Sequence, residues 1–409
     1  MTLEYERILP KVKDLVATAV NRQRQLDSQQ KEIAQKLTDY ATDRGAIAHS
    51  IKIAQEKTGG KLYAAEPHPA YAHEPLNKGV TAVNLPDTAV IIGGDGSQIL
   101  PDRHAPYLYY LINIGVIVYY HGRNRAPDVF TQPILEYPGL DWQADEGKFT
   151  SAHVSIQRDL AEIGALAETA CAQAAQTDDP VLALLDQRLL YWPVGGDNGR
   201  NDQKTVYEWI KAMRQVETCH REHGAVYLSG YISEPGTSAV VNMLRTLNVG
   251  RPDPETGEIF DPEVLKKRSA GLIDAALFAG ILQPGERSAV FVNISENNKT
   301  FKAQGQEVCF FYLHPGGGKH IARVDIPRWV ADDPTAVDQI HALIMDQCKM
   351  VYPYVLTRAD EIAVILSQDR DYLEKMIAVG MGPEFALRQG SAKQAGKDAA
   401  RSGKTRYGE

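Results

Sequence analysis

The sequence lacks the features that would make it a membrane, secreted or zinc-ribbon protein. None of its apolar runs reaches the roughly 18 residues that a membrane-spanning helix requires, and its N-terminus is charged rather than signal-like. Four cysteines, Cys171, Cys219, Cys309 and Cys348, lie far apart without a CxxC pair, which argues against both a zinc ribbon and a disulfide framework. We therefore predict a cytoplasmic protein in which the cysteines are small buried hydrophobes.

Two common catalytic motifs are also absent. There is no GxxxxGK[ST] loop, so any ATP-driven motor that works with this chain must be another protein. Ser97 follows Gly96 without a GxSxG elbow, and no cysteine has the spacing from a histidine that suggests a nucleophile. The chemistry of this protein must therefore be carried by other side chains.

The negative net charge is only weak evidence against a nucleic-acid substrate. The formal net charge is −8, from 44 Lys and Arg against 52 Asp and Glu, whereas affinity for phosphates normally comes from basic residues. A nuclease that holds divalent metals carries a carboxylate cluster by necessity, and local basic stripes can coexist with an acidic total. With 44% hydrophobic residues, the chain of 409 residues can bury one large core or two ordinary ones.

The chain divides into three regions. Residues 1–60 form an amphipathic helical region, residues 61–388 a main domain that opens with a linker or long loop at 66–75, and residues 389–409 a tail. Five Lys or Arg stand against two acids in that tail, with almost no large apolar groups, which predicts disorder. It is either a solvated tail or a weak phosphate-binding one.

The N-terminal region has apolar residues at helical spacing. Val12, Val16 and Val20 are followed by Ile33 and Leu37 among many polar residues, which predicts one or two long amphipathic helices. These helices form either a hairpin on the main domain or an arm for dimerisation or partner binding.

The main domain alternates apolar strand patterns with helical stripes. We predict strands at 89–92, 107–120, 181–185, 225–228, 289–293, 308–313 and 321–326, and helices at 153–176, 203–223, 238–247, 334–349 and 358–378. The strand–helix–strand order in the middle of the chain implies parallel pairing there, after an antiparallel portion. The predicted fold class is α/β.

Two aspartates follow apolar strand patterns. Asp95 comes where the first apolar run ends in small residues, Gly93-Gly94-Asp95-Gly96-Ser97, which would let a metal and a phosphodiester approach the carboxylate. Asp186 lies at the carboxyl end of the run at 181–185. Ligands of open α/β sheets bind outside these strand ends, so the two acids could flank one site. The alternatives are an ordinary turn for Asp95 and a helix cap or turn for Asp186.

Other acids lie on predicted helices. Asp159, Glu162 and Glu168 share the helix at 153–176, and Asp159 and Glu162 are three apart, so one of them could lean over the sheet edge as a third metal ligand. Most acids on such a helix simply face water. Asp360 and Glu361 fall in the first turn of the predicted helix at 358–378, where capping alone would explain them.

As an ordered set, these segments resemble the NurA nuclease family, the partners of HerA-type hexameric translocases in DNA end processing. The matching segments include the glycine run around Asp95, the acidic helix at 158–168, the strand ending in Asp186, and Tyr352-Pro353-Tyr354 leading into Arg358-Ala359-Asp360-Glu361. Segments at 285–291 and 326–330 also match, so the resemblance spans about residues 85–380.

The resemblance implies an RNase H-like mixed sheet flanked by helices, with an N-terminal helical extension. It further implies that Asp95, Glu162, Asp186 and Asp360 bind Mn²⁺ or Mg²⁺, as two ions, and that Tyr352 completes the site. This sequence has Asp360 where the family often has a histidine, which puts metal preference and any proton-transfer role in doubt. A carboxylate can replace an imidazole as a ligand of either ion.

The implied activity is a 5′–3′ DNA exonuclease and single-strand endonuclease, acting as a homodimer with a HerA-like hexameric ATPase. One alternative is a catalytically impaired subunit that keeps the fold and the translocase contacts. Another is a different metal-dependent phosphohydrolase on a related sheet.

Overall fold

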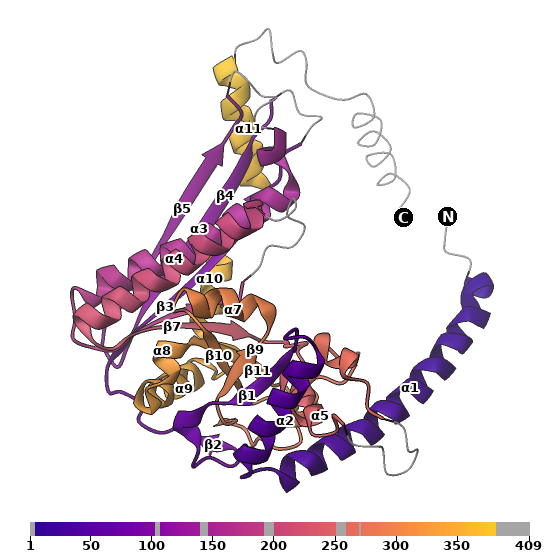
Figure 1. Cartoon of the computed structure of the whole chain (residues 1–409). Helices are drawn as coiled ribbons and strands as arrows, with labels where there is room; N and C mark the ends of the chain where they lie inside the picture. Colours follow the sequence, from indigo (N-terminus) through magenta and orange to yellow (C-terminus); the bar gives the residue numbers. More distant parts are fainter. Residues whose placement is uncertain are drawn as a thin grey trace.

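Eleven strands within the described residues form one mixed sheet (Figure 1). The computed structural model describes residues 5–102, 107–139, 146–191, 200–250, 259–269 and 271–381; the tail at 389–409 lies outside them. The strand order is β1-β9-β10-β11-β7-β6-β3-β4-β5, with β2 and β8 beside it. The strands are β1 Ala64–Pro67, β2 Val80–Thr81, β3 Ala89–Ile99, β4 Tyr110–His121, β5 Asp128–Glu136, β6 Val181–Leu185, β7 Val226–Ile232, β8 Glu286–Arg287, β9 Phe291–Ile294, β10 Val308–Leu313 and β11 Ala322–Pro327.

Five adjacent strands of this sheet carry the topology that matters for the site. Strands β3, β4 and β5 form an antiparallel meander, and β6 and β7 then pair in parallel on the other side of β3. The order β5-β4-β3-β6-β7, with helices crossing over between β5 and β6 and between β6 and β7, is that of an RNase H-like sheet. The predicted α/β fold class with an RNase H-like mixed sheet is confirmed.

Helices cover both faces of these strands (Figure 1). Helices α3 Ser151–Ala174 and α4 Arg200–His223 lie side by side on one face, where they share a hydrophobic core with the strands. A second core on the other face includes α9 Pro334–Gln347 and α10 Tyr354–Ala363, with α8 Arg328–Ala331 beside them. Because it is covered on both faces, β6 is apolar and buried throughout.

A third core joins the N-terminal helices to the far end of the sheet. It contains residues of α1 Tyr5–Asp39, α2 Arg44–Lys57, α5 Ala239–Thr246 and α6 Asp274–Phe278. Only the C-terminal half of α1 is packed, through Ile33 and Leu37, while its first turns extend away from the rest of the chain (Figure 1). The remaining elements are α7 Glu296–Ala303, α11 Ser367–Met381 and the 3-10 helices η1 Pro69–Tyr71, η2 Glu146–Phe149 and η3 Pro262–Lys266.

Three predictions about secondary structure need correction. The glycine run does not end a strand, because β3 continues through it to Ile99. Residues 66–75 are not a loop: they contain the end of β1, which pairs with β9, and the helix η1, and much of the segment is buried. The helix predicted at 358–378 is two helices, α10 and α11, separated at 364–366. Helix α10 begins at Tyr354, so Asp360 lies well beyond its first turn and helix capping does not explain it.

The cysteines divide into two kinds. Cys309 and Cys348 are free and buried, as predicted. Cys171 and Cys219 instead form a disulfide that links α3 to α4, so the prediction of no disulfide was wrong for this pair. No local pattern indicates this bond, because the two cysteines are 48 positions apart and only the packing of the two helices brings them together. Within the described part of the chain, no helix combines the length and apolar character needed to cross a bilayer.

Candidate metal and active site

Asp95 and Asp186 lie side by side on neighbouring parallel strands. The register pairs Gly93 with Leu184 and Gly94 with Leu185, so Asp186, which follows β6 directly, comes next to Asp95. Paired strands lie about 4.8 Å apart, and residues at the same register position point to the same face. Both carboxylates therefore occupy the α10 side of the sheet, where β6 ends and β3 continues.

Glycines around Asp95 let helices approach the strands from both sides. On one face, a Cβ added at Gly93 would lie 2.6 Å from the carbonyl oxygen of Val355, so α10 packs directly on the strand backbone. On the other face, a Cβ at Gly96 would lie 2.6 Å from Oε1 of Glu162. The glycine run is therefore a close-packing device that surrounds Asp95 with acids from two helices.

Glu162 on α3 is the acid that the second face brings in. Its side chain is buried, forms an ion pair with Nε of Arg158 at 3.1 Å, and accepts a hydrogen bond from Nε2 of Gln187 at 3.0 Å. Burial raises the pKa of Glu162 well above its usual value; Arg158 opposes this shift, and the negative charge of Asp95 adds to it. Glu168, on the same helix, is exposed.

Helix α10 and the segment before it supply the remaining groups. Asp360 on α10 lies close enough to Asp95 for its negative charge to raise the pKa of that carboxyl. Tyr352 donates a hydrogen bond to Asp186. Val351, directly before this tyrosine, has a φ of 72°, a conformation that is strained for a β-branched residue. The five residues predicted for the site thus lie on β3, on α3, at the end of β6, on α10 and in the segment before α10.

Electrostatics in this cluster favour a bound cation. Burial raises the pKa of Asp95 to about 6; the N–H of Gly96, 2.7 Å from Oδ1, opposes the shift, and the charges of Asp186 and Asp360 add to it. Burial also raises the pKa of Asp186, against the hydrogen bond from Tyr352. Carboxylates that raise one another's pKa are stabilised in their ionised form by a divalent ion between them, and oxygen donors suit Mg²⁺ and Mn²⁺.

The donor set therefore fits a hard divalent cation in its chemistry. Among the described residues, no three His, Cys, Asp or Glu side chains already stand in the arrangement of a formed metal site. Asp159, the other acid weighed on this helix, accepts a hydrogen bond from the Tyr191 hydroxyl at 3.0 Å and pairs with Arg158 at 3.0 Å. It belongs to the wall of an adjoining pocket.

Residues that follow Asp186 were not identified from the sequence. Gln187 holds Glu162, and Arg188 lines the pocket beside the carboxylates. Arg158, one turn before Glu162, is the cation of the cluster. A usable signal existed for the first two, because polar residues directly after a buried parallel strand lie at the edge where ligands bind.

The strand order and the acids at its centre define an RNase H-like protein with a carboxylate site. The NurA domain family matches residues 89–365, more than half of the chain, and the chain belongs to that family. Its predicted family membership is thus confirmed.

Two solved structures are similar to this chain. The NurA nuclease from Sulfolobus solfataricus is 14% identical with a TM-score of 0.49, over 92% of this chain and 96% of that one. Piwi from Drosophila is 8% identical with a TM-score of 0.28, over 67% of this chain and 29% of that one. Among curated proteins, none matches this sequence.

Proposed function

We propose that this chain is a divalent-metal-dependent nuclease that hydrolyses phosphodiester bonds in DNA. The observation that carries the proposal is the strand register that sets Asp95 beside Asp186, with Glu162 and Asp360 brought against them by close-packed helices. Membership of the NurA domain family supports it.

In this mechanism Asp95, Glu162, Asp186 and Asp360 would hold two ions, Mn²⁺ or Mg²⁺. When bound, such ions activate a water and stabilise charge on the phosphate and the leaving oxygen. Tyr352 orients the Asp186 carboxylate through its hydrogen bond.

Further aspects of the proposal concern substrate and assembly. We propose 5′–3′ exonuclease and single-strand endonuclease activity in DNA end processing with a HerA-like hexameric translocase, since the sequence has no phosphate loop of its own. We also propose a homodimer. The exposed apolar residues along the first half of α1, from Tyr5 to Val20, and on the edge strand β5, such as Val129 and Phe130, are surfaces suited to such contacts.

A digestion assay tests the enzyme claim. Wild-type protein with Mn²⁺ should degrade linear duplex DNA and cut circular single strands, with and without the translocase. Asp95→Asn and Glu162→Gln should each abolish cleavage. Glu168→Gln removes the same kind of charge from an exposed position of the same helix and should leave cleavage intact.

The outcomes separate the three functions considered for this fold. Wild-type protein that leaves both DNA substrates intact under every condition would refute the nuclease proposal. If it still bound the translocase, it would be a catalytically impaired subunit; if it hydrolysed mononucleotides only, it would be another phosphohydrolase.

A further inference from the structure

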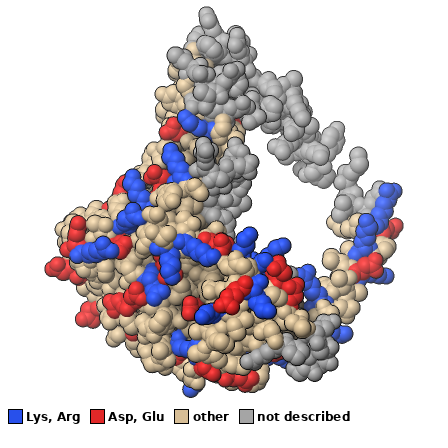
Figure 2. Space-filling view, in the orientation of Figure 1, with Lys and Arg blue, Asp and Glu red and all other residues tan. Residues whose placement is uncertain are grey.

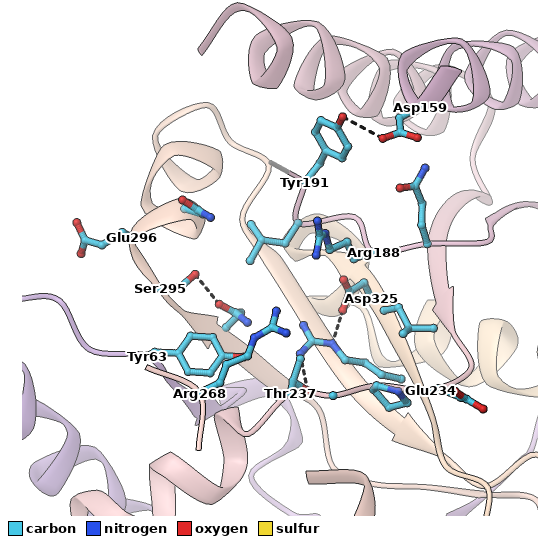
Figure 3. Close-up of a pocket in the computed structure, with 18 of the residues that line it drawn as sticks. Tyr63, Asp159, Arg188, Tyr191, Glu234, Thr237, Arg268, Ser295, Glu296 and Asp325 are labelled. Atoms are coloured by element: carbon cyan, nitrogen blue, oxygen red, sulfur yellow. Dashed lines mark hydrogen bonds and ion pairs between the residues drawn. The ribbon is translucent and has the colours of Figure 1, made fainter. Parts of the chain in front are cut away.

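A pocket of about 750 Å³ opens beside the carboxylate cluster and includes Asp186 in its lining. One wall is formed by the start of α3 and the segment after β6. The facing wall is formed by residues 61–63, 233–237 and 266–268 and by the start of α7 (Figure 3). The volume lies within the range typical of small-molecule sites. Any group bound here would lie next to the acids.

Most acids of this pocket are held by neighbouring cations. The pairs are Asp325–Arg323, Asp159–Arg158 and Glu296–Lys299. Asp325 is fully buried, with Oδ1 2.7 Å from Nε of Arg323, and its Oδ2 accepts the backbone N–H of Leu189. This buried pair fixes the chain just after Arg188. Glu234 lies toward the far edge of the pocket from Asp159 (Figure 3).

Two arginines from opposite walls point into the same space (Figure 3). Arg188 comes from the segment after β6, and Arg268 from the loop after η3. Burial lowers the pKa of Arg188, the positive charge of Arg268 lowers it further, and the negative charges of Asp325 and Asp159 oppose the shift. Lys61 and Lys267 also line the pocket. Like charges that converge in a partly buried site are stabilised by an anion between them, and the guanidinium fork matches phosphate oxygens.

The pocket also offers the partly exposed ring of Tyr63. Tyr191, by contrast, is buried, with its ring stacked on Trp209 at a centroid distance of 4.3 Å and its hydroxyl donating to Asp159. Tyr63 lines the facing wall near Arg268, with which it forms a side-chain hydrogen bond. Aromatic rings in a cationic groove are a common means of holding unpaired bases.

We infer that this pocket is a subsite for one unpaired nucleotide next to the scissile bond, in which Arg188 and Arg268 bind its phosphate from opposite walls and Tyr63 packs on its base. The inference rests on the proposed function, which makes a DNA strand the substrate. The site is local rather than part of a broad basic face, since acidic and basic side chains are interspersed on the visible surface (Figure 2). The phosphate is either the terminal phosphate of a strand or an internal phosphodiester.

Binding to a fluorescent single-stranded oligonucleotide tests the subsite without cleavage. The protein carries Asp95→Asn, and anisotropy is measured with Mg²⁺ present. Arg268→Gln and Arg188→Gln should each weaken binding about tenfold or more, the loss expected for one charge-assisted phosphate contact. Each should also make binding less dependent on salt.

The controls distinguish specific phosphate binding by the arginines from a nonspecific effect of positive charge and from a loss of folding. Arg268→Lys keeps the charge and should recover part of the affinity. Lys211→Gln removes a cation from an exposed position of α4 and should change nothing. Arg268 is exposed, so its replacement should not alter the thermal unfolding midpoint. If both arginine variants bind as tightly as the Asp95→Asn parent, the subsite does not exist.

Further measurements identify the kind of phosphate that binds and distinguish failure of the subsite proposal from failure of the nuclease proposal. A preference for oligonucleotides with a terminal phosphate over those with a hydroxyl assigns a strand end, while equal binding to linear and circular strands assigns an internal phosphodiester. If arginine replacement weakens binding but the protein with Asp95 intact never cleaves DNA, the subsite stands and the nuclease proposal is refuted. If the arginine replacements change neither binding nor, in the protein with Asp95 intact, cleavage, the subsite alone is refuted.

Discussion

Gly115 allows the sharpest test of how the site is built. It lies on β4 directly opposite Asp95 in the antiparallel register, and α10 passes over it. A Cβ at this position would lie 2.5 Å from the backbone nitrogen of Ala363 and 2.8 Å from the carbonyl oxygen of Ala359. Ordinary contacts are about 3.5 Å or longer. Both neighbours are backbone atoms, so no side-chain rotation relieves the clash and α10 itself must move by about 1 Å.

Gly115→Ala should therefore reduce both stability and activity. Overpacking of this kind costs about 1–3 kcal/mol of unfolding free energy. The displaced helix carries Asp360, and a shift of about 1 Å in a catalytic group can lower the rate about 100-fold. Urea unfolding followed by circular dichroism gives the first quantity, and the rate of DNA cleavage gives the second.

Gly164→Ala is the matched control. Gly164 lies inside α3 with no atom within 4 Å of the added Cβ, so the substitution should stabilise the helix by about 0.5–1 kcal/mol. The same added methyl group should thus have opposite effects at the two positions. A Gly115→Ala protein as stable and as active as wild type would refute the reasoning that α10 needs a bare strand backbone.

Three further predictions concern metal binding at Asp95, the buried histidine His341 and the disulfide. Because burial raises the pKa of Asp95 to about 6, protons compete with Mn²⁺ for this carboxylate below that pH. Mn²⁺ should therefore raise the melting temperature more above pH 6 than below it. Equal increases at the two pH values, or an increase in Asp95→Asn as large as in wild type, would contradict this prediction. Burial lowers the pKa of His341, which contacts the carbonyl of Gly285, to about 3. Folding is therefore favoured by the neutral imidazole, and this contribution to the free energy of unfolding is complete above about pH 6.5, the pKa of an unfolded histidine. The contribution is lost as the pH falls toward 3. Between neutral pH and about pH 5, the free energy of unfolding measured in urea should fall by about 2 kcal/mol because of this histidine. The fall should be smaller in His341→Gln, and an equal fall in the variant and the wild type would refute the prediction. Removing the Cys171–Cys219 disulfide, which joins positions 48 apart, should lower the free energy of unfolding by about 4 kcal/mol on chain-entropy grounds. If calorimetry finds a double serine variant as stable as the wild type, the disulfide makes no such contribution.

Part of the central sheet could be predicted from the sequence because several of its strands are short apolar runs. The run at 181–185 matches β6, and the run at 308–313 matches β10. The edge strand β5 was missed because it is exposed along almost its whole length and has no apolar pattern to separate it from a loop. The break between α10 and α11 was also missed, since no proline or glycine marks it.

The sequence by itself determined which acids were available and which strands and helices carry them. It could name Asp95 and Asp186 as strand-associated carboxylates, because strand patterns are local. Only the tertiary structure decided that these two are register neighbours, that Glu162 rather than Glu168 is buried against the glycine run, and that Arg188 and Arg268 line one pocket. These results depend on strand pairing and on how closely helices dock against bare glycine backbone, and such long-range packing is not set by any local pattern.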